Sequence, residues 1–390
     1  MLALTYGSSV YGVDANLITI EVNVTQGTKF FMVGLPDNAV KESQQRVESS
    51  IKHLGYKFPR QKVIVNLAPA DVRKEGSAYD LPIALGILAA SEQINAPKMN
   101  EYIILGELSL DGKLRPIKGV LPIAIEARKR GLKGFILPKS NASEAAIVNN
   151  IDVYGVETLQ EAIGILEGTS SQSPMIKDTR DVFEYEQDQF EVDFADVQGH
   201  ESAKRSLEVA AAGGHNVIMV GPPGSGKTML AKRLQTILPP MTLHEALETT
   251  KIHSVAGKLK ENSSLVAQRP FCSPHHTSSS AALVGGGGIP QPGQISLAHN
   301  GILFLDELPE FKREVLEVLR QPLEERMVTI SRAKASVDFP ANFMLLASMN
   351  PSPSGDFYTN DGSHPDSLGT VQRYLGKISG PLLDRIDIQV

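Results

Sequence analysis

The stretch Gly221-Pro222-Pro223-Gly224-Ser225-Gly226-Lys227-Thr228 decides the fold of the C-terminal half of the chain. It lies between an apolar, strand-like run at 217–220 and a helix-like run at 229–237. A glycine-rich loop in this context is typical of a phosphate-binding loop, because its free backbone amides point at the phosphate. We expect Lys227 to reach the β- and γ-phosphates of a nucleotide, and the Thr228 hydroxyl to bind Mg²⁺. An ordinary glycine-rich turn is the alternative interpretation.

The bulk properties are those of a globular protein with several domains. The 390 residues favour two or three domains, and 42% hydrophobic and 21% charged residues are ordinary values. A single cysteine, Cys272, excludes a disulfide framework and suits a reducing compartment. The chain opens without a signal peptide, and its longest apolar run, at 81–90, is about half of a bilayer span. We therefore expect a cytoplasmic protein without a membrane segment.

The charge of the chain is concentrated in one segment. Residues 168–198 contain 2 Lys+Arg and 8 Asp+Glu, which accounts for the whole net charge of −6. This segment lacks apolar periodicity, so we expect a solvated acidic linker at 168–192. It would separate a domain at 1–167 from an ATPase core at 193–390. Each of these domains is nearly neutral, so composition alone does not favour nucleic-acid binding.

Two carboxylates follow the apolar run at 302–305, which is typical of a buried parallel strand. Ligands of α/β sheets bind at the carboxyl ends of the strands. We expect Asp306 to hold Mg²⁺ and Glu307 to act as the general base on the attacking water. A strand that simply ends in solvated acids is the alternative.

Two further residues belong to the same predicted nucleotide site. Asn350 follows a third strand-like run at 343–347 and would orient the water, although an Asn-Pro pair alone is also a turn signal. Arg385, near the end of the sequence, fits either a surface ion pair or an arginine finger that reaches a neighbour's nucleotide.

The order of these elements resembles that of the AAA+ ATPases. The longer motifs resemble the magnesium-chelatase-like branch and, within it, the ComM/YifB family: Pro274-His275-His276-Thr277, 285–293, 295–300 and 379–385. The resemblance implies ATP and Mg²⁺ as ligands, and a ring, usually a homohexamer, whose sites are shared between subunits. It also implies that the segment 194–199, through Val197 and Gly199, contacts the adenine.

The resemblance also suggests DNA as a partner, single-stranded or branched. The glycine run at 285–288 would form a loop facing the pore of the ring. Residues 327–339 predict a hairpin, and in the similar minichromosome maintenance helicases such a hairpin places a lysine on DNA. Lys334 occupies that place and Arg332 lies beside it, so both are candidate DNA contacts; a solvated hairpin tip is the alternative. A phosphate contact would make binding salt-dependent and independent of base sequence.

The N-terminal domain alternates predicted strands and helices. Together with Lys74-Glu75-Gly76 and 106–112, this pattern resembles the proteolytic domain of Lon proteases, which use a serine nucleophile and a lysine base. The matching positions carry Ala78 and Leu121, which can neither attack nor accept a proton. Ser77 adjoins the site without a base aligned to it. We expect a Lon-like α+β fold that is inactive as a protease and serves as a platform for the ring or for DNA.

A zinc site is not expected. His275 and His276 are adjacent, which is poor spacing for one metal ion, so His276 and Thr277 would instead cap or pack an element. Some relatives carry paired cysteines after the Asn-Pro, but this sequence has Ser352 and Ser354 there and no cysteine before His364.

The combined prediction is an α/β protein with a Lon-like domain followed by an AAA+ P-loop core with a parallel sheet. It would be an ATP-driven ring motor that remodels DNA, as a branch-migration helicase in recombination or natural transformation. The alternatives are a metal-chelatase motor subunit, an active Lon-like peptidase, and a nucleotide-dependent scaffold without turnover. Because the sequence stops a few residues after Arg385, we expect the helical lid of an AAA+ module to be missing and the chain to be a fragment.

Overall fold

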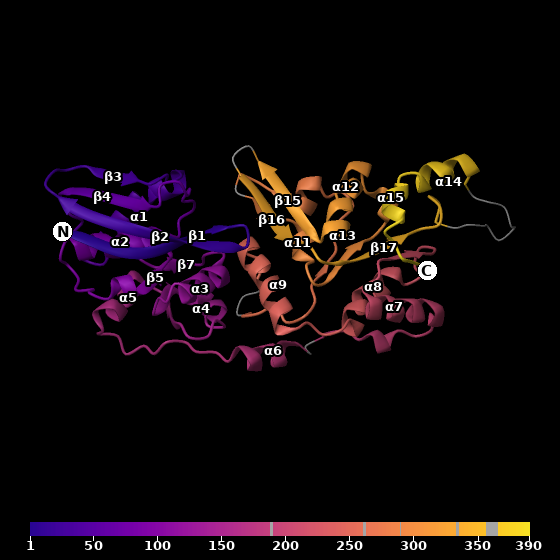
Figure 1. Ribbon diagram of the computed structural model, residues 1–390, viewed down its shortest axis with the longest axis horizontal. Helices are drawn as coiled ribbons and strands as arrows, with labels where there is room; N and C mark the ends of the chain where they lie inside the picture. Colours follow the sequence, from indigo (N-terminus) through magenta and orange to yellow (C-terminus); the bar gives the residue numbers. More distant parts are fainter. Residues whose placement is uncertain (188–189, 260–262, 289, 333–334, 356–365) are drawn as a thin grey trace. The chain divides into compact units, whose positions relative to one another are not determined.

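The computed structural model describes residues 1–187, 190–259, 263–288, 290–332, 335–355 and 366–390. Its contacts divide the chain into two compact units (Figure 1). Unit 1 consists of Met1–Val182 together with His253–Leu265, and unit 2 consists of Phe183–Ile252 and Val266–Val390. Among the described residues, no helix has the length and apolar character needed to cross a membrane.

A seven-stranded mixed sheet forms the centre of unit 1, in the order β3-β4-β2-β1-β5-β8-β9. The long strands β1 and β2 pair antiparallel along their whole length, and β5, β8 and β9 continue the sheet in parallel. The strands are β1 (Leu2–Tyr11), β2 (Asp14–Thr25), β3 (Phe30–Val33), β4 (Lys62–Ala68), β5 (Tyr102–Ile104), β8 (Gly134–Pro138) and β9 (Asp152–Val156), with a separate pair β6 (Glu107–Leu108) and β7 (Leu114–Arg115).

The helices of unit 1 begin and end where the sequence supplies caps or apolar faces. They are α1 (Asn38–His53), α2 (Asp80–Ala90), α3 (Val120–Lys129), α4 (Lys139–Ala145) and α5 (Leu159–Glu167). Asp37 caps α1 by accepting the Val40 amide at 2.7 Å. Helix α2 is apolar on all sides and is buried between the β1–β2 pair and α1, which explains its lack of a polar face.

Residues 253–265 were assigned by sequence to the C-terminal domain, yet they pack in unit 1. The Ser254 carbonyl accepts the Gly119 amide at 3.1 Å, at the start of α3. The Ser254 hydroxyl donates to the buried Glu144 carboxylate, which also accepts the Leu121 amide at 2.9 Å. Burial raises the pKa of Glu144, and these hydrogen bonds partly oppose that shift. Contacts between residues this far apart in sequence complete the fold of unit 1.

Unit 2 is built on a five-stranded parallel sheet in the order β11-β14-β17-β10-β18. Its strands are β10 (Val217–Val220), β11 (Phe271–Cys272), β14 (Ile302–Leu305), β17 (Met344–Met349) and β18 (Ile388–Gln389). The residues of β14 and β17 are buried throughout, as expected for central parallel strands. Parallel pairing brings the carboxyl ends of β10, β14 and β17 to one edge, which is where the predicted site residues occur.

Helices α7 and α8 of unit 2 pack their apolar residues against this sheet. Leu207 of α7 and Leu230 of α8 join Phe304 and Leu346 in one core cluster. The helices are α7 (Glu201–Gly213), α8 (Lys227–Leu234), α12 (Arg313–Glu317), α13 (Arg320–Glu325), α14 (Leu368–Leu375) and α15 (Gly380–Leu383). A further helix, α9 (Leu243–Ala256), begins in unit 2, and its residues from His253 on belong to unit 1. The acidic segment predicted as a linker contains a further helix, α6 (Thr179–Gln187), which sequence reasoning did not anticipate.

Two insertions interrupt the alternation of strands and helices (Figure 1). The glycine run forms a short ladder of β12 (Gly285–Gly286) and β13 (Gln291–Pro292), flanked by α10 (Ser280–Val284) and α11 (Gln294–Leu297). The predicted hairpin is present as β15 (Met327–Arg332) and β16 (Ala335–Pro340), which pair only with each other.

Candidate nucleotide-binding site

The loop between β10 and α8 has the backbone conformation that its glycines predict. Gly224 and Gly226 have φ angles of 75° and 81°, in the left-handed region that other residues occupy only with strain. Gly226 directly precedes α8, so the amides of the first turn of that helix are left free. The loop can therefore surround an anion, as the sequence indicates.

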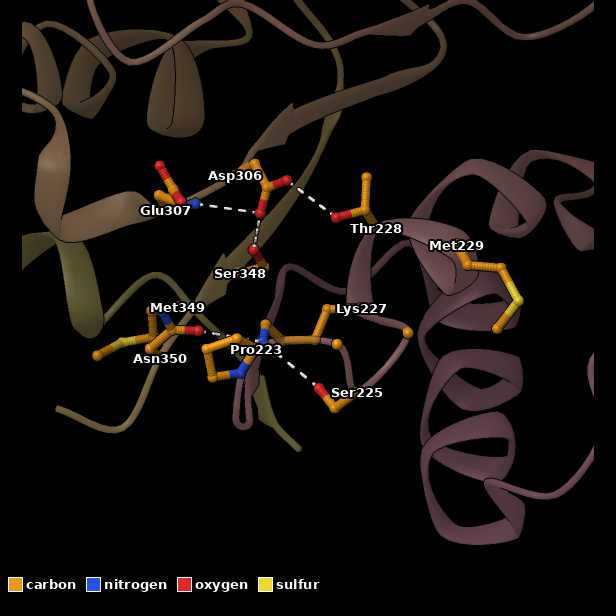
Figure 2. A pocket seen from close by; sticks show the side chains of 12 residues that line it. Pro223, Ser225, Lys227, Thr228, Met229, Asp306, Glu307, Ser348, Met349 and Asn350 are labelled. Atoms are coloured by element: carbon orange, nitrogen blue, oxygen red, sulfur yellow. Dashed lines mark hydrogen bonds between the residues drawn. The ribbon is translucent and has the colours of Figure 1, made fainter. Parts of the chain in front are cut away.

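A cleft of about 420 Å³ lies over this loop and over the carboxyl ends of β14 and β17 (Figure 2). It brings together most of the residues that the sequence assigned to the nucleotide. The lining residues are Pro223, Gly224, Ser225, Gly226, Lys227, Thr228, Met229, Asp306, Glu307, Ser348, Met349 and Asn350.

The amine of Lys227 lies at the centre of the loop. It donates to the carbonyls of Gly221 at 2.6 Å and Pro222 at 2.9 Å, and it lies 3.3 Å from Oδ1 of Asn350. Burial lowers the pKa of this amine, and the nearby Asp306 carboxylate opposes the shift. The structure thus places Asn350 beside the loop lysine, where the sequence predicted a group near the γ-phosphate.

The carboxylate of Asp306 joins three elements of the site (Figure 2). Its Oδ2 accepts the Thr228 hydroxyl of α8 at 2.9 Å, and its Oδ1 accepts the Ser348 hydroxyl of β17. The Glu307 amide also donates to Oδ1, at 3.2 Å. Carboxylate and hydroxyl oxygens are the ligands that Mg²⁺ prefers, so Asp306 and Thr228 fit the predicted ion. The sequence analysis assigned no role to Ser348. Its position near the carboxyl end of β17 could have indicated that it belongs to the site.

Glu307 is held in an unusual backbone conformation at the mouth of the cleft. Its φ of 55° lies in the left-handed region, and its side chain is 56% exposed. Nδ1 of His276 lies 3.3 Å from its carboxylate, and the ring of His275 stacks on His276 at 4.1 Å. His276 packs as the sequence predicted, with its ring edge-on to that of Phe311 at 6.4 Å, and it is in addition the partner of Glu307.

The segment predicted to contact adenine adjoins the loop but does not line the cleft. A Cβ atom at Gly226 would lie 3.7 Å from Nε2 of His200, so the residues around 200 border the loop. Val197 is buried in the core cluster with Phe194, and Gly199 has a φ of 68°. The adenine contact of Val197 and Gly199 remains a prediction.

Arg385 lies at the opposite end of the sheet from the cleft. The strand that follows it, β18, pairs Ile388 with Val217, the first residue of β10. The phosphate-binding loop begins at Gly221, four residues after Val217. At the usual rise of a strand, this is roughly 13 Å from Val217. Arg385 therefore cannot complete the cleft of its own chain.

The predicted DNA contacts fall largely outside what the structure describes. Lys334 lies outside the described residues, and only the backbone of Arg332 is described, at the end of β15. His364 is likewise outside the described residues. The hydroxyls of Ser352 and Ser354, at the place of the cysteine pair of some relatives, lie 2.9 Å apart.

The positions aligned with the Lon catalytic pair have structural partners. The Ala78 carbonyl accepts the Gly106 amide at 2.8 Å, and the Leu121 side chain is fully buried. The Ser77 hydroxyl donates to the Glu107 carboxylate, so a proton acceptor is aligned to this serine, contrary to the prediction from the sequence. The amine of the buried Lys74 donates to the Pro69 carbonyl.

Comparison with known proteins identifies relatives for both parts of the chain. The family described as "Magnesium chelatase, subunit ChlI" matches residues 193–390, and "Subunit ChlI of Mg-chelatase" matches residues 20–141. Lon protease 2 of Bacillus subtilis is 28% identical over 183 residues, which cover 42% of this chain and 32% of that protein.

Several relatives match over the whole sequence, among them ComM and YifB proteins. Competence protein ComM of Haemophilus influenzae is 46% identical over 394 residues, covering 100% of this chain and 76% of that protein. The YifB protein of Escherichia coli is 46% identical over 391 residues, covering 100% and 75%. With the parallel sheet and the phosphate-binding loop in place, the chain belongs to the ComM/YifB family of magnesium-chelatase-like AAA+ ATPases.

Proposed function

We propose that this protein is an ATP-driven ring motor that moves branched DNA. The observation that carries the ATPase part is the Asp306 carboxylate, which receives hydrogen bonds from Thr228 and Ser348 within the cleft that contains Lys227. This arrangement gathers hard oxygen ligands beside a cationic amine, as a magnesium–nucleotide complex requires.

Five residues of the cleft have a role in hydrolysis under this proposal. Thr228 and Asp306 would hold Mg²⁺, which would neutralise phosphate charge, and the Lys227 amine would bind the β- and γ-phosphates in place of its loop carbonyls. Glu307 takes a proton from the attacking water, and its exposure at the mouth of the cleft leaves it open to that water. Asn350, beside the Lys227 amine, orients the water.

The same proposal requires more than one subunit. Because Arg385 lies at the end of the sheet remote from its own loop, it would complete the site of a neighbour. An arginine supplied in this way stabilises the charge of the transition state. A homohexameric ring, in which every subunit gives one arginine and receives another, satisfies this need.

We take DNA as the substrate of the motor, acting in the cytoplasm during recombination or natural transformation. The relative ComM is named a competence protein, and in the sequence Arg332 ends β15 while Lys334 falls between β15 and β16. A basic tip that contacts phosphates would bind without regard to base sequence. We infer that unit 1 is a platform without peptidase activity, because Ala78 and Leu121 supply neither nucleophile nor base.

The test is migration of a branched DNA substrate by the purified protein with ATP and Mg²⁺. We expect migration with the wild type and none with Lys227→Ala, which loses the phosphate contact. Lys334→Glu should weaken DNA binding and reduce the slope of log affinity against log salt by about 1. Lys41→Glu, the same charge change on an exposed residue of α1, is the matched control and should bind DNA normally. Wild-type protein that hydrolyses ATP but moves no branch would refute the DNA assignment.

A second candidate is the motor subunit of a metal chelatase, which the family description of residues 193–390 favours. Such a subunit acts on a partner that carries a tetrapyrrole. ATPase activity that rises with that partner and not with DNA would select this function over the first.

A further inference from the structure

The guanidinium of Arg385 is bound within its own unit. Its Nη2 forms an ion pair with the Glu324 carboxylate, and its Nη1 donates to the Pro381 carbonyl. The side chain is only 23% exposed, and its Nε is buried with no hydrogen-bond partner among the described residues. The Arg385 guanidinium, which would reach a neighbour's nucleotide, is therefore bound within its own subunit.

The backbone of Arg385 is fixed independently of this side-chain contact. Nδ2 of Asn216 donates to the Arg385 carbonyl at 2.8 Å, and the Asn216 amide donates to Asp387 at 2.8 Å. Asn216 directly precedes β10, so the main chain at 385 is tied to the central sheet. Only the side chain can exchange partners, and Glu324 is its charged partner.

Glu324 lies at the base of the β15–β16 hairpin. It belongs to α13, whose Pro322 and Leu323 are buried, and this helix ends one residue before Arg326. The Arg326 carbonyl accepts the Ala341 amide at 2.8 Å, and its Nη1 donates to the Phe343 carbonyl at 3.0 Å. These hydrogen bonds connect Arg326, directly before β15, to residues 341 and 343, directly after β16. Two residues, Glu325 and Arg326, separate Glu324 from the first residue of β15.

We propose that Glu324 is a positioning residue that restrains Arg385 until the hairpin is displaced. The inference rests on the proposed function, since it names the regulation of the same shared site. DNA at the hairpin shifts the end of α13 and withdraws the carboxylate. The guanidinium, whose donors then lack an anionic partner, becomes available to the phosphates of the neighbouring subunit. DNA binding in one subunit would in this way set the rate of hydrolysis in the next.

Steady-state ATPase assays of Glu324→Gln, with and without DNA, test the restraint. Glutamine has nearly the same shape, and the side chain is 56% exposed, so the variant should fold. We expect its DNA-free kcat to rise by about two- to fivefold, the range that a half-exposed ion pair allows. Its stimulation by DNA should fall towards 1, while its KM for ATP should stay at the wild-type value.

Glu325→Gln is the matched control, because this neighbouring carboxylate pairs with Gln321 at 2.8 Å and not with Arg385. It should retain both the wild-type basal rate and the wild-type stimulation. The double variant Glu324→Gln/Arg385→Ala should be as slow as Arg385→Ala alone, since the restraint acts only through the arginine. A mere loss of stability would not produce this dependence.

These experiments distinguish failure of the Glu324 restraint from failure of the shared ATPase site. An Arg385→Ala variant with normal ATPase activity would refute the shared-site assignment itself. If Arg385→Ala is slow but Glu324→Gln keeps the wild-type basal rate or the wild-type DNA stimulation, the restraint is wrong and the shared site stands. If DNA does not stimulate the wild type, the DNA substrate is refuted, while a raised basal rate in Glu324→Gln still supports the restraint.

Discussion

The cleft of unit 2 and the positions of unit 1 that align with the Lon catalytic pair differ in the side chains that they contain. In unit 2, one carboxylate, Asp306, collects hydroxyl donors from two other elements. In unit 1, the positions predicted to match the Lon serine and lysine hold Ala78 and the fully buried Leu121. The nearby Glu144 carboxylate accepts the Leu121 amide of α3. Apolar packing thus maintains a fold whichever side chains occupy these positions, whereas a site such as the unit 2 cleft depends on a few polar side chains.

Glu307→Gln gives the strongest test that the unit 2 cleft is catalytic. Glutamine keeps the size of the side chain but cannot take a proton, so we expect hydrolysis to fall by about 10²–10⁴-fold while nucleotide binding persists. Single-turnover hydrolysis and fluorescent-nucleotide titration measure the two quantities separately. Undiminished turnover would mean that the protein uses another base and would weaken the contrast between the two units.

The double variant Ala78→Ser/Leu121→Lys tests whether unit 1 is separated from an active peptidase by only two residues. Leu121 is fully buried, so a lysine there should cost on the order of 3–5 kcal/mol of stability and should not restore activity. Thermal unfolding and casein cleavage are the measurements. Ala78→Ser alone, at a half-buried position, is the milder control. Cleavage of casein by the double variant would show that the reactive geometry of unit 1 has survived.

Ser348→Ala tests the network around Asp306 without touching a predicted magnesium ligand. Loss of the hydroxyl leaves Oδ1 of Asp306 with only the Glu307 amide as a donor, so we expect ATPase activity to fall by about 5- to 10-fold. Ser296→Ala is the matched control, because that buried hydroxyl has no hydrogen-bond partner among the described residues. If Ser348→Ala and Ser296→Ala lowered ATPase activity equally, the hydrogen bond from Ser348 to Asp306 would not be required for hydrolysis.

Glu144→Gln gives the smallest effect and concerns the packing of unit 1. Burial raises the pKa of Glu144 above its ordinary value of 4.5, so its contribution to stability is complete below pH 4.5 and is lost as the pH rises through the folded-state pKa. The variant cannot ionise, so its stability relative to wild type should increase as the pH rises through the folded-state pKa of Glu144. Urea unfolding between pH 4.5 and 8 measures this. If the difference in unfolding free energy between wild type and Glu144→Gln stayed constant across that pH range, the raised pKa of Glu144 would be contradicted.

Local patterns explain which parts of the fold and site could be predicted. The loop, β10 and β14 were located correctly because glycine positions and short apolar runs encode them within a few residues. Strand β1 was missed because its sequence mixes glycine and serine with apolar residues, and its position depends on pairing with β2. The contacts of His276 with Glu307 and of Glu324 with Arg385 join residues far apart in the chain, so no local spacing indicates them.

The place of residues 253–265 in unit 1 has a consequence for the order of synthesis. Chains emerge from the ribosome N-terminus first, and domains usually fold as they appear. Unit 1 departs from this scheme, because the Gly119 amide finds its acceptor only when Ser254 has been made. Until then, the buried Glu144 lacks its hydroxyl donor, and α7 and α8 have already been translated. The nascent protein therefore has to keep an unfinished first unit soluble while it begins the second.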